Sequence, residues 1–116
     1  MTQPMILTDR AALIRHRERA RSRPGHAEAL FLHHLALSDL QERLSEVNRR
    51  FTASAVVTGF PEIFRELASA FVVADDDLIA LEPGAHDLVV HAMSLHWAND
   101  PIGQLVQCRR ALKPDG

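Results

Sequence analysis

The stretch that decides the fold of this chain is HDLVVHAMSLHWANDPIGQLVQCRRALKPDG, residues 86–116. Its apolar residues 88–90 predict a strand that is covered on both faces, as in a parallel sheet. Asp100 and Pro101 are typical of a helix start, and we expect that helix to run to about Leu112. The proline and glycine that follow end it. The side chains expected to face inward are Ile102, Leu105, Val106 and Ala111.

Two more strands are predicted upstream. Ser54–Thr58 is short, apolar and β-branched and is ended by Gly59, and Phe71–Val73 is a similar run. Between them, Pro61 suits the first turn of a helix that continues to about residue 68. Residues 78–81 form either a strand stub or an irregular turn. This alternation of strands and helices indicates an open, parallel α/β sheet.

Two helices are predicted before the strands. Asp9 or Thr8 is a good N-cap for a first helix that fades around Ser22. The Pro24-Gly25 pair separates it from a second helix over about 26–48. The chain is therefore divided into an N-terminal helical segment, 1–50, and a sheet-forming segment, 51–116. Six arginines near the first helix are interpreted as a solvated helix face rather than a binding patch: Arg10, Arg15, Arg17, Arg19, Arg21 and Arg23.

Composition limits the partners and the compartment. A chain of 116 residues holds at most one domain, and its net charge of -2 gives no reason to expect nucleic acid or an anionic membrane as a partner. Cys108 is the only cysteine, which excludes an intrachain disulfide and fits a reducing compartment. No apolar run approaches the roughly 20 residues of a membrane span, and no signal-peptide pattern opens the chain. A cytoplasmic location is therefore expected.

Four sequence blocks carry a resemblance to a known family: Ala74-Asp75, Asp87-Leu88-Val89-Val90, Ser94-Leu95-His96-Trp97-Ala98-Asn99-Asp100 and Leu112-Lys113-Pro114-Asp115-Gly116. Together they resemble class I S-adenosylmethionine-dependent methyltransferases of the type 11 kind. The similar branch includes the malonyl-carrier-protein methyltransferases and the methyltransferase-like assembly factors of respiratory complex I. The resemblance implies a truncated Rossmann-like sheet after two helices, S-adenosylmethionine at the carboxyl ends of the first strands, and methyl transfer to an unknown acceptor.

One departure from the family pattern concerns the cofactor turn. Active members carry a D-x-G-x-G-x-G turn after the first strand, whereas residues 56–61 here keep Gly59, lack the acid and add Phe60 and Pro61. A bulky side chain at this turn would occupy cofactor volume, and proline removes a backbone donor. Whether the chain is an enzyme is therefore open. The alternative is a catalytically inactive assembly or protein-binding module.

The second departure is missing chain before Phe71. The spacing from Ala74 to Asp87 favours Phe71–Val73 as the family's third strand, in which case the strand whose acid binds the ribose is lost. In the alternative, Phe71–Val73 fills the second-strand position in space. Asp75 follows Gly59 by 16 residues and would then be the ribose acid, since that acid lies about 20 residues after the glycine turn of dinucleotide folds.

These arguments assign Gly59, Asp75 and His91 to cofactor binding, and His96 and Trp97 to substrate binding. A histidine at the mouth of a strand suits a general base or a substrate contact near neutral pH. The competing interpretations are structural: a solvated loop for residues 75–77, hydrogen-bonded and partly buried histidines, and a tryptophan that packs its loop on the next helix. No metal site and no catalytic residue is predicted, and Cys108 is expected to face the core.

In the family, further strands follow the motif that ends here at Gly116. Without them the last predicted strand has an unpaired edge, which is an aggregation liability. We therefore expect the chain to be the N-terminal fragment of a longer protein. A homodimer, or the N-terminal helices, would also cover that edge.

Overall fold

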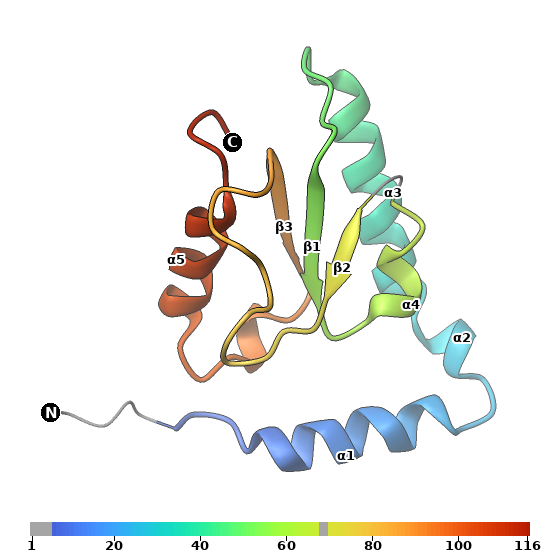
Figure 1. The fold of residues 1–116 in the computed structure, drawn as a ribbon. Helices are drawn as coiled ribbons and strands as arrows, with labels where there is room; N and C mark the ends of the chain where they lie inside the picture. The colour runs from blue at the N-terminus through green and yellow to red at the C-terminus, as the bar shows by residue number, and fades with distance from the viewer. Residues whose placement is uncertain (1–5, 68–69) are drawn as a thin grey trace, which may run out of the picture.

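The computed structural model describes residues 6–67 and 70–116 as a three-stranded parallel sheet surrounded by helices (Figure 1). The elements in chain order are α1 Arg10–Arg21, α2 His26–Ala29, α3 Phe31–Glu46, β1 Ser54–Thr58, α4 Pro61–Phe64, β2 Phe71–Val73, β3 Leu88–Ala92, the 3-10 helix η1 Leu95–Trp97 and α5 Pro101–Ala111. The predicted α/β class, a truncated Rossmann-like parallel sheet preceded by helices, is confirmed.

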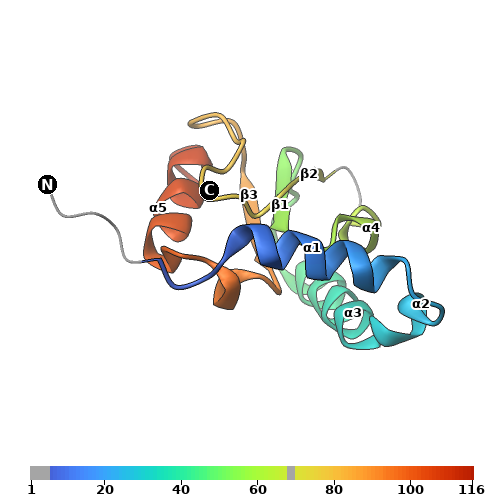
Figure 2. The same cartoon turned by 90° about the horizontal axis from the view of Figure 1, so that it is seen from below.

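The central strand of the sheet is β1, and all five of its residues are buried. It pairs in parallel with β2, where Ala55 lies opposite Phe71, and with β3, where Ser54 lies opposite Leu88. Because all three strands run the same way, their carboxyl ends meet at one edge of the sheet. In both views α1 lies across this edge (Figures 1 and 2).

The position of β2 decides between the two interpretations of Phe71–Val73. The strand order is β2-β1-β3, so β2 lies directly beside β1. The strand β2 therefore fills the second-strand position in space, as the alternative requires. The physical reason is the short connection, residues 59–70, which is about the minimum for a crossover between parallel strands and cannot skip a strand position.

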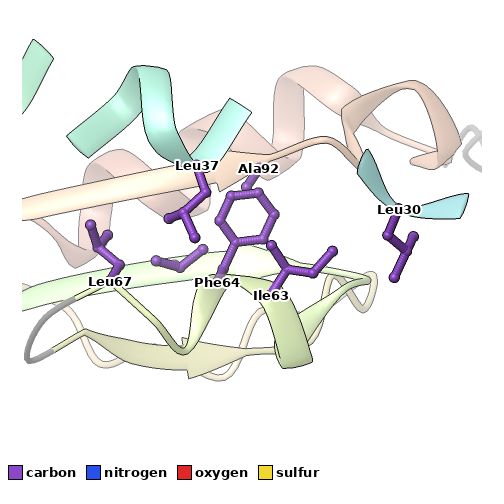
Figure 3. Packing of buried hydrophobic residues seen from close by; sticks show 7 residues of the cluster. Leu30, Leu37, Ile63, Phe64, Leu67 and Ala92 are labelled. Carbon is purple, nitrogen blue, oxygen red and sulfur yellow. The ribbon is translucent and has the colours of Figure 1, made fainter. Parts of the chain in front are cut away.

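The main core lies between the sheet and the helices α3 and α4 (Figure 3). Its buried members are Leu30, Leu37, Val56, Ile63, Phe64, Leu67 and Ala92. Leu30 and Leu37 come from the segment before residue 50, so the predicted helical and sheet-forming segments share one core. A smaller cluster, Val57, Ile79 and Cys108, lies between β1 and α5, which confirms that Cys108 faces the core.

The expected burial of β3 and α5 is wrong in part. Only Ala92 of β3 is fully buried, because β3 has β1 on one edge and none of the described strands on the other. In α5 the exposed fractions of Ile102 and Leu105 are 74% and 50%, and Val106 is also exposed. The buried row is instead Gln104, Cys108 and Ala111, spaced by four and three residues along the helix face that touches the sheet.

The helix starts follow the sequence, whereas some ends differ. The Asp9 and Asp100 carboxylates accept hydrogen bonds from Ala12 N (3.0 Å) and Gly103 N (2.9 Å), which confirms both N-caps. The predicted second helix is interrupted at Leu30 between α2 and α3. The helix α4 ends at Phe64, so its predicted continuation over residues 65–67 is wrong, and Ala68 lies outside the described residues. Residues 78–81 are irregular, and none of the described helices is long and apolar enough to cross a membrane.

Candidate functional site

The carboxyl edge of the sheet brings Gly59 and Asp75 together. Gly59 follows β1, and Asp75 lies two residues after the end of β2. Both line a cavity of about 330 Å³. In open α/β sheets ligands bind outside the carboxyl ends of the strands, so this cavity is the candidate cofactor site.

Hydrogen bonds between β1 and β3 hold the turn at Gly59. The Gly59 backbone N–H donates to Ser94 Oγ (2.9 Å), and that hydroxyl donates to Ala92 O (3.1 Å). Thr58 Oγ1 also donates to Ala92 O (3.0 Å) and accepts from Phe60 N (3.1 Å). These polar groups are buried, so the turn is fixed by satisfied hydrogen bonds rather than by a run of glycines.

Asp75 is a buried carboxylate held by two arginines of α1. Asp75 is only 3% exposed. Both of its carboxylate oxygens accept hydrogen bonds from Arg17, with Nη1 2.9 Å from Oδ1 and Nη2 3.0 Å from Oδ2. Arg10 Nη2 donates to Asp75 O (2.8 Å) and lies 3.4 Å from Oδ1. Burial raises the pKa of Asp75, but the hydrogen bonds and charges of Arg17 and Arg10 together hold it below its usual value. A solvated loop is therefore the wrong interpretation for Asp75, although Asp76 and Asp77 are exposed.

The interpretation of the arginines as a solvated helix face is wrong for Arg10 and Arg17, which are partly buried, whereas Arg21 is exposed although it also bonds to the turn after β1. Arg10, Arg17 and Arg21 are spaced by seven and four residues, so they share one face of α1, and that face points to the sheet. Arg21 Nη2 donates to Gly59 O (2.9 Å), and the Arg17 guanidinium lies 5.7 Å from the centre of the Phe60 ring. The spacing of seven and four residues indicates from the sequence that these arginines share a helix face. Their partners, Asp75 and Gly59 O, are identified only by the hydrogen bonds in the structure.

Arg17, rather than Phe60 or Pro61, occupies the space beside Gly59. A Cβ built on Gly59 would lie 2.5 and 2.6 Å from the two terminal nitrogens of Arg17. The Phe60 ring turns toward α3 and packs on His33 with 4.1 Å between ring centres, and Pro61 begins α4. Phe60 therefore does not fill this volume, whereas Pro61 lines the cavity together with Arg17, which comes from a distant segment.

These residues, as arranged, do not fit S-adenosylmethionine. Arg17 and Arg10 cover both carboxylate oxygens of Asp75, whose residue is only 3% exposed, so ribose hydroxyls cannot reach them. The approach to Gly59 is closed by the same guanidinium. Four arginines line the cavity, and the sulfonium of this cofactor is itself a cation, so the charges repel.

His91 lies apart from this cavity. It sits on β3 opposite Val57, and its Nε2 is 2.9 Å from Gln104 Oε1 on α5. Gln104 is 2% exposed, and its Nε2 donates to Asp76 O (2.7 Å). His91 is thus a partly buried, hydrogen-bonded histidine that ties β3 to α5 and to the loop after β2.

His96 and Trp97 lie on η1, and Arg10 of α1 bridges this segment to the loop after β2, with Nη1 3.5 Å from Trp97 O and Nη2 2.8 Å from Asp75 O. His96 and Trp97 are both exposed, and their ring centres are 4.9 Å apart. Trp97 lines a second cavity of about 580 Å³, together with Leu13, Leu30 and Phe60. The helix α1 borders both cavities, so it separates Trp97 from the Gly59 and Asp75 pair. Within the described residues, no three His, Cys, Asp or Glu side chains are placed to hold a metal ion.

Comparison with known proteins places the chain in a family. The family model described as "Methyltransferase domain" matches residues 30–116. The human mitochondrial arginine-hydroxylase NDUFAF5 is 41% identical over 51 residues, which are 44% of this chain and 15% of that protein. Its zebrafish (Danio rerio) counterpart is 37% identical over 51 residues, 44% of this chain and 16% of that protein. No solved structure matches the chain.

The family match covers most of the chain and all of the sheet. The shared segment spans only 15 to 16% of the length of the two relatives. Members of the family generally use S-adenosylmethionine. The resemblance drawn from the sequence blocks is confirmed, and the chain belongs to the methyltransferase domain family.

Proposed function

We propose that this chain contributes the cofactor site of an S-adenosylmethionine-dependent methyltransferase whose acceptor the sequence does not identify. The observation that carries the proposal is the position of Asp75. It is a buried carboxylate after the strand next to β1, and it shares a cavity with Gly59. A ribose acid takes this position relative to the glycine turn in related dinucleotide folds. Gly59 would let the cofactor approach the backbone, and His91 would support the loop after β2 through Gln104.

The acceptor is proposed to enter the cavity lined by Trp97. That cavity has about 580 Å³ of space, and its walls include the apolar side chains of Leu13, Leu30 and Phe60. Sites of this size and lining suit small organic molecules or a single apolar side chain. His96 lies beside Trp97 and would contact the acceptor from the rim.

A second candidate is a binding or assembly module without methyl transfer. The occupation of the cofactor cavity by Arg17 favours it, as does the single glycine of the turn. The names of the relatives are a further reason to consider this second candidate. NDUFAF5 is called an arginine-hydroxylase, so similarity to this domain does not fix the reaction. For either candidate, we also propose that a protein partner or a second copy of the chain covers the open edge of β3. A cytoplasmic location is likewise part of both proposals.

The test is isothermal titration calorimetry with S-adenosylmethionine and S-adenosylhomocysteine. We expect the wild-type protein to bind, and we expect Asp75→Asn to bind at least about tenfold more weakly, because a hydrogen bond to a charged acceptor contributes about 1.5–3 kcal/mol. The matched control is Asp77→Asn, whose carboxylate is exposed two residues away and which should bind as the wild type does. The proposal is wrong if neither the wild type nor Arg17→Gln binds either compound at millimolar concentration.

A further inference from the structure

Polar contacts, rather than apolar packing, hold α1 over the cofactor cavity. Leu13 is the one buried residue of this 12-residue helix. The contacts on its inner face include the pairs of Arg17 and Arg10 with Asp75 and the hydrogen bond from Arg21 to Gly59 O. Just before the helix, Leu7 N and Thr8 N donate to Asn99 Oδ1 at 2.8 and 2.6 Å. Water can replace each of these partners when the helix leaves, so leaving costs far less than breaking an apolar core.

The connection to α2 can act as a hinge. Residues 22–25 join α1 to α2, and Gly25 has φ = +81°, in the left-handed region that glycine adopts without strain. Figure 2 shows α1 extending from this connection across the ends of the strands. A rotation at residues 22–25 would therefore move α1 away from Gly59 and Asp75 while the core formed by α3 and α4 stays in place.

The Arg17 guanidinium and the cofactor cannot occupy the space beside Asp75 and Gly59 together. Arg17 uses both carboxylate oxygens of Asp75, which are the acceptors that ribose hydroxyls need. Its guanidinium also fills the approach to Gly59. We propose that α1 is an autoinhibitory strap, in which Arg17 competes with the ribose of the cofactor for Asp75 and the cofactor binds only after α1 has moved away. This inference rests on the cofactor site proposed above.

A strap of this kind lowers the apparent affinity in a calculable way. When only a fraction of molecules is open, the apparent dissociation constant equals the intrinsic one divided by that fraction. If about one molecule in ten is open, releasing the strap tightens binding by up to about tenfold. Asp75→Asn and Arg17→Gln both weaken the strap, but only Arg17→Gln keeps the ribose acceptor. Arg17→Gln should therefore bind the cofactor more tightly than Asp75→Asn, which has lost that acceptor.

The test compares Arg17→Gln with Arg15→Gln in the full chain. Arg15 lies on the same helix but is exposed, so it is the matched control. Amide hydrogen exchange of residues 10–21 should be faster in Arg17→Gln and unchanged in Arg15→Gln. Calorimetry should show S-adenosylmethionine binding about tenfold tighter to Arg17→Gln than to the wild type. Arg17→Lys keeps the charge but loses the two-point contact with Asp75. Its affinity for S-adenosylmethionine should therefore lie between those of the wild type and Arg17→Gln.

Three outcomes would count against the strap. Unchanged exchange of residues 10–21 in Arg17→Gln would show that Arg17 does not hold α1. Faster exchange with the same cofactor affinity as the wild type would show that α1 does not compete, and it would leave the proposed cofactor site intact. Faster exchange with no cofactor binding to any variant would instead remove the proposed function, and the autoinhibitory role with it.

Discussion

Gly59 and Ser94 join the ends of two strands through one buried hydrogen bond, from Gly59 N to Ser94 Oγ at 2.9 Å. Ser94 is 1% exposed, and its hydroxyl in turn donates a hydrogen bond to Ala92 O. The substitution Ser94→Ala leaves the Gly59 N–H without this acceptor. We therefore expect the free energy of unfolding to fall by about 1–3 kcal/mol. Urea unfolding measures this loss directly.

The control for that loss is Ser45→Ala on α3. The Ser45 hydroxyl also donates to a backbone carbonyl, that of Glu42, but the residue is exposed and water can take its place. Its removal should change the free energy of unfolding by less than about 0.5 kcal/mol. Equal losses for the two serines would show that the Ser94 bond does not fix the turn.

Gly59→Ala is expected to loosen α1 without improving cofactor binding. The added Cβ would meet the terminal nitrogens of Arg17 at 2.5 and 2.6 Å, so the guanidinium must move off Asp75. The same methyl group stands where the cofactor would approach the backbone. Amide exchange of residues 10–21 should therefore rise as in Arg17→Gln, while the affinity for S-adenosylmethionine falls below that of the wild type. Tighter binding by Gly59→Ala would contradict the assignment of Gly59 to the cofactor site.

The pair of Asp75 and Arg17 should make stability depend on pH in the acid range. The pKa of Asp75 in the folded protein lies below its usual value because the two arginines outweigh the effect of burial. A carboxyl group of this kind stabilises the fold above its unfolded pKa of about 3.9, and that contribution is lost as the pH falls through the lower folded pKa. The difference in unfolding free energy between wild type and Asp75→Asn should be constant from pH 7 to about pH 5 and shrink below about pH 4.

Urea unfolding between pH 3 and pH 7 checks this dependence. Asp77→Asn, in which an exposed carboxylate is replaced, should follow the wild type over the whole range. A gap between wild type and Asp75→Asn that does not change with pH would mean that the charge of Asp75 contributes nothing to the pair with Arg17.

Local sequence signals predicted the elements of this fold well. The apolar, β-branched run at Ser54–Thr58 is the buried centre of the sheet, because its side chains suit a strand covered on both faces. Asp9 and Asp100 begin helices because their carboxylates satisfy free N–H groups of the first turn. Both signals depend on residues within a few positions of each other, so a single sequence is enough to predict these elements.

The parts that sequence missed depend on contacts between distant segments. Arg17 and Asp75 are 58 positions apart, and nothing near either residue indicates that they meet. The place of β2 beside β1 depends on a crossover whose length is close to the minimum, which the spacing of later motifs did not reveal. In α5 the apolar residues Ile102 and Leu105 look like core, yet Gln104 is buried because it bonds to His91 and to Asp76 O.

Cys108 should be unreactive in the native protein although it lies on a short surface helix. It packs with Val57 and Ile79, and burial raises the pKa of its thiol, so little of the reactive thiolate forms. We expect Ellman's reagent at pH 8 to modify it at least about a hundredfold more slowly than in denaturant, since reaction requires local opening. The matched control is the double variant Leu105→Cys, Cys108→Ala, which moves the thiol to an exposed position of α5 and should react at nearly the unfolded rate. Fast reaction of the wild type would mean that α5 does not stay packed on the sheet through its Gln104, Cys108 and Ala111 face.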